Sequence, residues 1–440
     1  MNRKPSMLVI FLTVFIDLVG FGIVVPLTPV FGRHFGANGL LIGVIVASFS
    51  AMQFIFSPIW GRLSDRHGRR PILLISTAGA VVSYVLFALA SGLANHLTAI
   101  VMMILARSFA GVFGGNLTVA QAYIADITPP EHRSKKMGII GMAFGFGLIC
   151  GPAIGGFSLK YLGITGPGWV AAGICAANFL LAFRILAESR RPDSSTVAPR
   201  PHLAQWQHTL SQPHVGLLVV VFFLSIFCFS VFESTLALLV CDNFGLDIRS
   251  DATTATTATW LFVFCGLIGA FVQGGMIGRV VKKYGEPKVI AASLVLTAIS
   301  LAMMPFIKSG SSLPLSWKVL FQPQGHVWWL MLAALAILSV GSSLTRAPLF
   351  GLLSNLTPAS EQGATIGVAQ GAGSFARILG PIFATTTLVY YPPLPYLTST
   401  AILLITGLVA AMNLRGTAHV SRPSAGTVPP PRPQTADPAA

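Results

Sequence analysis

Five ionisable residues stand within the long apolar stretches of the sequence: Asp17, Arg107, Glu233, Arg346 and Arg377. A charged side chain in the middle of a bilayer costs about 2.5–3.5 kcal/mol on insertion scales, so each is a candidate for function and must face water or a partner. A buried carboxylate takes up a proton more readily than one in water, which suits Glu233 to load and release H⁺. Arg377 is then its partner or an anchor for an anion. For any one of these residues, a structural ion pair is the alternative.

Three arginines against two carboxylates leave an excess of positive charge, which favours ligands that include anions or zwitterions. This inference weakens if Arg346 reaches the cytoplasmic surface along its apolar stem. Four further polar side chains in the same stretches could line a shared cavity: Asn116, Gln121, Gln273 and Gln370.

The composition is that of a membrane protein. Of the 440 residues, 54% are hydrophobic and only 9% are charged, whereas a soluble domain carries about 25% charged residues. The net charge of +15 does not indicate a nucleic-acid partner, because the cations gather in short loops between apolar stretches. The five cysteines form no CxxC pair, so neither a disulfide framework nor a zinc site is predicted.

Twelve stretches are long and apolar enough to span a bilayer, which takes about 20 residues. The predicted spans are 7–31, 40–61, 71–93, 98–126, 136–160, 167–187, 215–241, 256–279, 287–307, 327–355, 363–390 and 393–414. The sequence therefore predicts an all-α membrane protein with twelve transmembrane helices. The first stretch is too long for a signal peptide and shows no clear cleavage site.

The distribution of cations sets the predicted orientation. Twelve spans place both termini on one side, which carries 20 of the 28 Lys and Arg residues, while the other side carries five and the spans three. Cations gather on the cytoplasmic side, so both termini are predicted to be cytoplasmic, in a cell inner membrane. The Pro-rich stretch 188–214 predicts a cytoplasmic linker between a first bundle, 1–187, and a second, 215–414. Residues 415–440, rich in Pro and Ala, are predicted to be a disordered tail.

The two predicted bundles repeat each other's residues. Gly151-Pro152 recurs 229 residues later as Gly380-Pro381, and Gly61-Arg62 recurs 217 residues later as Gly278-Arg279. Two six-helix repeats around a midplane cavity are the plan of many secondary transporters. The sequence therefore predicts two pseudo-symmetric six-helix bundles around a central cavity.

The segment between the second and third spans reads Gly61-Arg62-Leu63-Ser64-Asp65-Arg66-His67-Gly68-Arg69-Arg70-Pro71. It is predicted to be a tight turn in which Gly61 lets two helices touch. Asp65 can accept hydrogen bonds from a helix N-terminus, and the arginines can pair with carboxylates or lipid phosphates. An ordinary basic loop is the alternative.

The predicted fifth span carries a cluster of small residues: Gly141, Gly145, Gly147, Gly151, Pro152, Gly155 and Gly156. Glycines four residues apart give a smooth helix face, and the eighth span offers Gly266, Ala270, Gly274 and Gly278 at the same spacing. The two helices are therefore predicted to face each other across the bundles, and Pro152 can bend the fifth span. Plain close packing is the alternative to a moving interface.

These motifs resemble those of the major facilitator superfamily over residues 1–414. The 61–71 segment is similar to the signature loop of that family, almost residue for residue. The stretch from Asp17 to Pro26 resembles the first-helix motif of its twelve-span drug/proton antiporters, which include tetracycline exporters. Arg107 and the glycines after it resemble the basic motif of the fourth helix. The glycines of the fifth span resemble the motif that marks antiporters and is thought to seal them against proton leak.

The resemblance implies roles for several residues. It implicates Asp17 in proton coupling or in packing of the first helix, and Arg107 in proton transfer. Asp126 should pair with Arg69, and Asp65 should meet the start of the eleventh span at 362–365, so that the outward-open state is latched. The expected latch residues are Gly61, Asp65, Arg66, Gly68, Arg69, Arg70 and Asp126. In the second repeat, Lys282 and Asn355 replace Asp65 and Asp126, so a second latch is expected to be degenerate.

The resemblance implies proton-coupled export of small amphipathic molecules or drugs of the tetracycline type by alternating access. A proton-coupled symporter or a uniporter of an organic anion or metabolite is the main alternative. An enzyme is not predicted, because catalytic signatures are missing from the sequence, and the proton gradient is the expected energy source, without cofactor or metal. The expected partners are a small-molecule substrate, protons and the lipid bilayer, and the chain is expected to be a monomer.

Overall fold

The structure, a computed structural model, describes residues 5–24, 27–37, 39–190, 201–246, 251–310, 312–313, 315–388 and 390–414. The first half contains α1 (Met7–Val24), α2 (Thr28–His34), α3 (Gly39–His67), α4 (Arg69–Ser91), α5 (His96–Val112), α6 (Asn116–Ile127), η1 (Pro130–His132), α7 (Arg133–Leu162) and α8 (Gly166–Ile185). The second half contains α9 (His202–Ser211), α10 (Pro213–Phe244), α11 (Asp251–Phe271), η2 (Val272–Met276), α12 (Ile277–Tyr284), α13 (Glu286–Met303), η3 (Met304–Phe306), α14 (Trp317–Leu320), η4 (Pro323–Gly325), α15 (His326–Leu356), α16 (Gln362–Leu388) and α17 (Leu394–Asn413). The predicted all-α fold is confirmed.

Within the described residues, eleven helical segments are long and apolar enough to cross a membrane, so the chain is a multi-pass membrane protein. The predicted span 363–390 is not among the eleven. It forms the continuous 27-residue helix α16, which contains many glycines and carries Gln370, Ser374 and Arg377. The predicted span 98–126 is divided between α5 and α6, and the predicted span 256–279 contains the π-helical turn η2.

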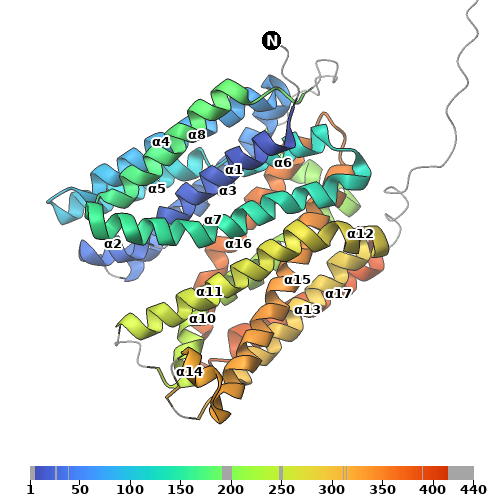
Figure 1. Cartoon of the computed structure of the whole chain (residues 1–440). Helices are drawn as coiled ribbons and strands as arrows, with labels where there is room; N and C mark the ends of the chain where they lie inside the picture. Colours follow the sequence, from blue (N-terminus) through green and yellow to red (C-terminus); the bar gives the residue numbers. More distant parts are fainter. Residues whose placement is uncertain are drawn as a thin grey trace, which may run out of the picture.

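The long helices pack as two groups (Figure 1). In the first group α1 packs against α7 and α8, α3 against α5, and α4 against α8. In the second, α13 packs against both α15 and α17, and α10 against α16. The groups meet where α3 contacts α16 and where α7 contacts α11, η2, α12 and α15. The boundaries predicted for the two bundles remain a prediction.

Both ends of the described chain lie at the same end of the molecule. Figure 1 shows the start of α1 and the end of α17 on the side of α12, where the ribbons of the two groups converge. The groups diverge toward α2 and α14. The outside carries large exposed apolar side chains such as Leu105, Phe271 and Leu408, which fits a surface whose solvent is lipid.

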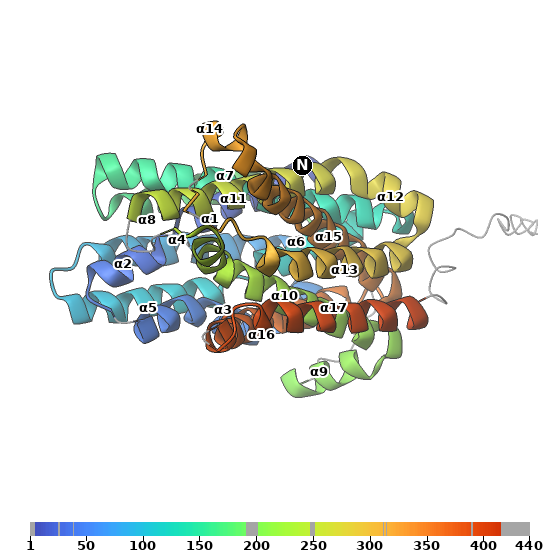
Figure 2. The ribbon, with the colours of Figure 1, turned by 90° about the horizontal axis from the view of Figure 1, so that it is seen from below.

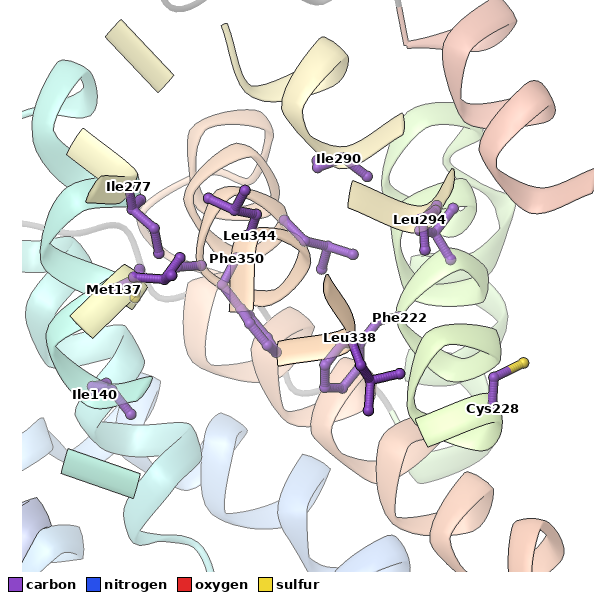
Figure 3. Close-up of a cluster of buried hydrophobic side chains, with 14 of the residues drawn as sticks. Met137, Ile140, Phe222, Cys228, Ile277, Ile290, Leu294, Leu338, Leu344 and Phe350 are labelled. Atoms are coloured by element: carbon purple, nitrogen blue, oxygen red, sulfur yellow. The ribbon is translucent and has the colours of Figure 1, made fainter. Parts of the chain in front are cut away.

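A continuous apolar core joins the two groups at the converging end. Figure 3 shows part of it: Met137 and Ile140 come from α7, Ile277 from α12, and Leu344 and Phe350 from α15. Side chains from both groups therefore share one core beside the helix ends that carry the candidate latch.

The turn after the second span is tighter than predicted. Helix α3 continues through His67 and α4 begins at Arg69, so that Gly68 alone separates them. Gly68 has a φ of 96°, which only glycine adopts readily. Most of the predicted loop 61–71 is therefore helical, because the polar residues extend the two helices instead of interrupting them.

The predicted linker 188–214 also contains a helix, α9, which sequence reasoning missed. Figure 2 shows α9 at the edge of the bundle, outside the long helices. Its Trp206 ring lies 5.5 Å from the Phe54 ring of α3, centroid to centroid, and His208 Nε2 lies 3.2 Å from Glu361 Oε2 before α16. Helix α9 thus contacts both groups. Residues 191–200 of the linker, the predicted tail 415–440 and Pro26 lie outside the described residues.

Candidate functional site

Asp65, near the end of α3, connects the two groups of helices. Its Oδ1 accepts a hydrogen bond from the backbone N–H of Gly363 at 3.0 Å, and its Oδ2 accepts one from Ala364 at 2.7 Å. The first turn of a helix offers free N–H groups and a partial positive charge, here those of α16. The predicted contact between Asp65 and residues 362–365 is therefore present.

Arg69 holds the acids of this contact. Its Nη1 lies 2.6 Å from Asp65 Oδ1 and its Nε 2.9 Å from Asp126 Oδ2, and its side chain is 0% exposed. The predicted pair of Arg69 and Asp126 is present. Because buried acids need a hydrogen-bonded cation, Arg69 fixes the direction in which Asp65 points toward α16.

Gly61 brings α3 against α16. A methyl group added at Gly61 would overlap the carbonyl oxygen of Gly363, which is backbone and cannot rotate away. The α3–α16 contact, defined here by Gly61, Asp65, Arg69 and Asp126 with the first turn of α16, therefore depends on glycine as well as on charge.

The other predicted latch residues do not join the two groups. Arg70 donates through Nε to Leu186 O at 2.8 Å and through Nη2 to Phe183 O at 3.0 Å, which caps the end of α8. Arg66 is exposed. Gly68 makes room for Glu188, whose carboxylate accepts from the backbone N–H groups of Arg69 and Arg70 at 2.8 and 3.0 Å. Sequence reasoning missed Glu188, which caps α4 from 119 residues away along the chain.

In the second repeat Lys282, which replaces Asp65, is exposed, and the two groups are joined there through other residues. At the offset of 217, Glu286 occupies the place of Arg69. Glu286 is 3% exposed, and its Oε1 accepts from Ser134 Oγ of α7 at 3.1 Å. Arg133 Nη1 donates to Ser354 O at 2.9 Å and to Asn355 Oδ1 at 3.1 Å. The comparison of only the positions of Asp65 and Asp126 overlooked these partners.

The glycines of α7 serve two faces, which corrects the prediction of one face. Gly145 faces Ala270 of the second group, where an added methyl would lie 3.3 Å from Ala270 Cβ, and Gly141 faces the side chain of Gln273. The predicted approach of the fifth and eighth spans is therefore present.

The remaining glycines of α7 face α1 or open space. Methyl groups added at Gly147, Gly151 and Gly155 would meet Leu18, Gly22 and Ile23 of α1. Gly156 has no described atom within 4 Å of an added methyl. Pro152 lies within the continuous helix α7. Three of the glycines thus hold one group together, since Gly147 lies two residues after Gly145 and therefore on nearly the opposite face of the helix.

Gly61→Ala is expected to separate α3 from α16, because the added methyl overlaps the backbone of α16. The state in which the two helices touch should be destabilised by about 1–3 kcal/mol. Gly156→Ala is the matched control, and it should leave the contact unchanged. Spin labels on His67→Cys and Ala359→Cys, both exposed positions, report the distance between the two groups. A wild-type distance distribution in Gly61→Ala would show that this approach is not required.

Asp17 and Arg107 lie among neutral partners in the first group. Asp17 Oδ2 accepts from Asn116 Nδ2 at 2.8 Å, while its buried Oδ1 has no hydrogen-bond partner within the described residues. The Arg107 guanidinium lies 4.8 Å from the centroid of the Phe49 ring. Tyr84 lies near both Asp17 and Arg107. The carboxylate and the arginine therefore share a neighbour, and neither forms an ion pair with another described residue.

Arg377 reaches from α16 to α3. Its Nη2 donates to Gln53 Oε1 at 2.8 Å and to Ser374 Oγ at 3.1 Å. Glu233 is exposed and interacts electrostatically with Arg377, although no ion pair within 4.0 Å joins these two described residues. Gln53, which sequence reasoning missed, lies one turn after Phe49 on the same face of α3. Arg107 and Arg377 therefore contact neighbouring positions of one helix, from different groups.

Three of the four predicted cavity residues lie between the groups, and the fourth, Asn116, lies within the first group. Gln370 Nε2 donates to Gln121 Oε1 at 2.8 Å across the interface, and both side chains are buried. Gln273 Nε2 donates to Ser343 Oγ at 3.2 Å, whereas Asn116 is bound to Asp17. Gln121 and Gln273 line a cavity of about 10 Å³, room for one water molecule at most. Within the part of the chain that the structure describes, no group of three or more His, Cys, Asp or Glu could hold a metal ion.

Known proteins are similar to this chain in sequence and in fold. A sequence profile of the Major Facilitator Superfamily matches residues 10–321 and, in a second match, residues 275–436. The chain is 31% identical over 389 residues to the tetracycline resistance protein, class E, of Escherichia coli, with 87% of each chain covered. It is 26% identical to multidrug resistance protein 2 of Bacillus subtilis (strain 168), over 86% of this chain and 88% of that protein. The crystal structure of the human organic anion transporter MFSD10 (TETRAN) has the same fold, with a TM-score of 0.73 at 22% sequence identity, and covers 92% of this chain and 98% of that chain.

Proposed function

The chain belongs to the major facilitator superfamily, a family of transporters and not of enzymes, and from this premise we propose that it exports small amphipathic molecules in exchange for protons. Its relationship to tetracycline and multidrug resistance proteins supports drugs of the tetracycline type as substrates. The observation that carries proton coupling is Asp17, a carboxylate deep in α1 whose only described side-chain partner is a neutral amide. Such a group can change its protonation state without breaking an ion pair.

The proposed orientation places both termini in the cytoplasm of a cell whose inner membrane holds the protein as a monomer. The excess of Lys and Arg on the side of the termini supports it. In that orientation the α3–α16 contact closes the cytoplasmic end, which makes this the outward-facing state.

In the proposed cycle, a proton that enters from outside neutralises Asp17 or Glu233. Loss of this charge shifts the equilibrium between the outward-facing and the inward-facing arrangement of the two helix groups. The groups rock about the close contacts of α7 and α16. The α3–α16 contact then parts and a substrate enters from the cytoplasm. The proton is then released inside and the contact closes again, so that the substrate is exposed to the outer side and leaves there.

A symporter or uniporter of an organic anion is the second candidate. The arginines at the interface, Arg346 and Arg377, favour it, and so does the fold shared with a human organic anion transporter. The direction of flux relative to the proton gradient separates the two candidates, because an antiporter and a symporter move substrate in opposite directions.

A susceptibility screen in a host that lacks its own efflux pumps tests export. Wild type should raise resistance to at least one of a panel of tetracyclines, lipophilic cations and organic anions, and Asp17→Asn or Glu233→Gln should lower it. Asp242→Asn is the control and should behave as wild type. Asp242 is an exposed acid whose Oδ2 lies 4.0 Å from Lys308 Nζ. Equal resistance from wild type and both variants would remove these carboxylates from the mechanism, and resistance to none of the panel would contradict drug export.

A further inference from the structure

We propose that Arg346 binds the anionic group of the transported molecule, in a site that residues of both helix groups complete. The inference rests on the proposed transport of small amphipathic molecules and adds the charge class of the substrate: a carboxylate or sulfonate with a lipophilic body. Arg346 lies on α15, ten residues before its end at Leu356.

Arg346 is a cation without an anionic partner among the described residues. Its guanidinium lies 5.6 Å from the centroid of the Phe144 ring and 5.9 Å from that of Phe222. No described carboxylate lies within 4.0 Å of it, and the charge that acts on it is the like charge of Arg377. Two aromatic faces offset part of the cost of holding a cation here, but they leave its donors open to an anion.

The surroundings of Arg346 form one polar wall and one apolar wall. Gln121 and Gln273 line the same cavity, and Gln273 Oε1 is buried without a hydrogen-bond partner in the described chain. Met137, Ile140 and Phe350 form the apolar wall, and Figure 3 shows them in the core between α7 and α15. A small number of polar groups that point to one place beside an apolar surface is typical of small-molecule sites. An anion would meet the guanidinium while its apolar body covers this wall.

The site is divided between the groups that move. The first group supplies Gln121, Met137 and Ile140, and the second supplies Gln273 and Arg346. The enclosed space of about 10 Å³ is too small for a carboxylate, so a ligand enters only when the groups part. Gln273 lies in the π-helical turn η2, and single π-helical turns are frequent at functional sites. Opening of the cytoplasmic end would expose Arg346 to that side, where an exporter loads.

Three compounds with one aromatic body and different charges test the proposal: biphenyl-4-carboxylate, its methyl ester and biphenyl-4-methylammonium. Their binding to the full chain in lipid nanodiscs is measured by calorimetry. The carboxylate should bind at least about tenfold more tightly than the ester. Arg346→Gln should remove that difference and leave ester binding unchanged, and Arg346→Lys should keep part of it. Arg279→Gln, at an exposed cation of α12, is the control and should alter none of the three.

Other results would overturn the proposal. The first is an equal affinity of wild type for the carboxylate and the ester, and the second is no measurable binding of the carboxylate. The third is an Arg346→Gln variant that binds both compounds more weakly by the same factor. Flux of the carboxylate under a proton gradient is measured separately. Tighter binding of the carboxylate than of the ester, without proton-driven flux, would support the Arg346 site and contradict the proposed coupling. Proton-driven flux of the carboxylate without tighter binding of it would support the coupling and contradict the Arg346 site.

Discussion

Arg69→Met is expected to abolish transport and to open the α3–α16 contact. The side chain is fully buried between Asp65 and Asp126, so its removal leaves two buried acids without a cation. Breaking such a set costs about 3–5 kcal/mol. The closed state, in which Asp65 accepts hydrogen bonds from the N–H groups of Gly363 and Ala364, is the state that is destabilised. A protonated or displaced Asp65 no longer attracts the start of α16. A shift of this size reverses a two-state population.

The spin-label pair on His67→Cys and Ala359→Cys measures that opening, in a background without native cysteines. Arg69→Met should show mainly the long distance, while wild type shows mainly the short one. Arg66→Met removes an exposed arginine of the same segment and should keep both the short distance and transport. If Arg69→Met transports and closes as wild type does, the buried acids do not control the α3–α16 contact.

Asp17→Asn is expected to reduce proton-driven transport to the level of protein-free vesicles. Asparagine has the shape of aspartate and its Oδ1 can still accept from Asn116, so the packing of α1 is preserved. It cannot take up a proton, so a proton gradient no longer acts on this position. Substrate exchange in the absence of a gradient should persist, because it needs alternation of the two groups but no net proton movement.

Glu233→Gln, measured in the same two assays, shows which carboxylate carries the proton. Loss of driven transport in only one of the variants assigns the proton to that residue. Loss of both driven transport and exchange in Asp17→Asn would instead indicate that the position holds the first helix in place. Unchanged driven transport in Asp17→Asn would remove it from the coupling.

The spans and the α3–α16 contact could be predicted because their signals are local. Apolar length marks a spanning helix, and the ordered residues 61–71 carry both the acid and the arginine of the contact. The resemblance to the major facilitator superfamily then indicated which helix start they would meet. The span at 363–390 was predicted from its length and apolar residues, although α16 is too polar to stand among the eleven apolar spans.

The missed residues depend on contacts between distant segments. Glu188 caps α4, and Gln53 binds Arg377 across 324 residues of sequence. A lone Glu or Gln has no spacing that distinguishes it from a surface residue. Glu286 was missed for a different reason: the second contact keeps the positions of the repeat but changes their chemistry, and a search for the same acid and arginine passes over it.

The direction of substrate movement under a proton gradient tests the central claim most directly. In proteoliposomes with an acidic lumen, a labelled tetracycline or another substrate from the susceptibility screen should accumulate inside, and a protonophore should release it. Vesicles that contain Asp17→Asn and protein-free vesicles set the background for passive uptake. Accumulation that instead requires an alkaline lumen, or uptake that does not respond to the gradient, would contradict proton-coupled export.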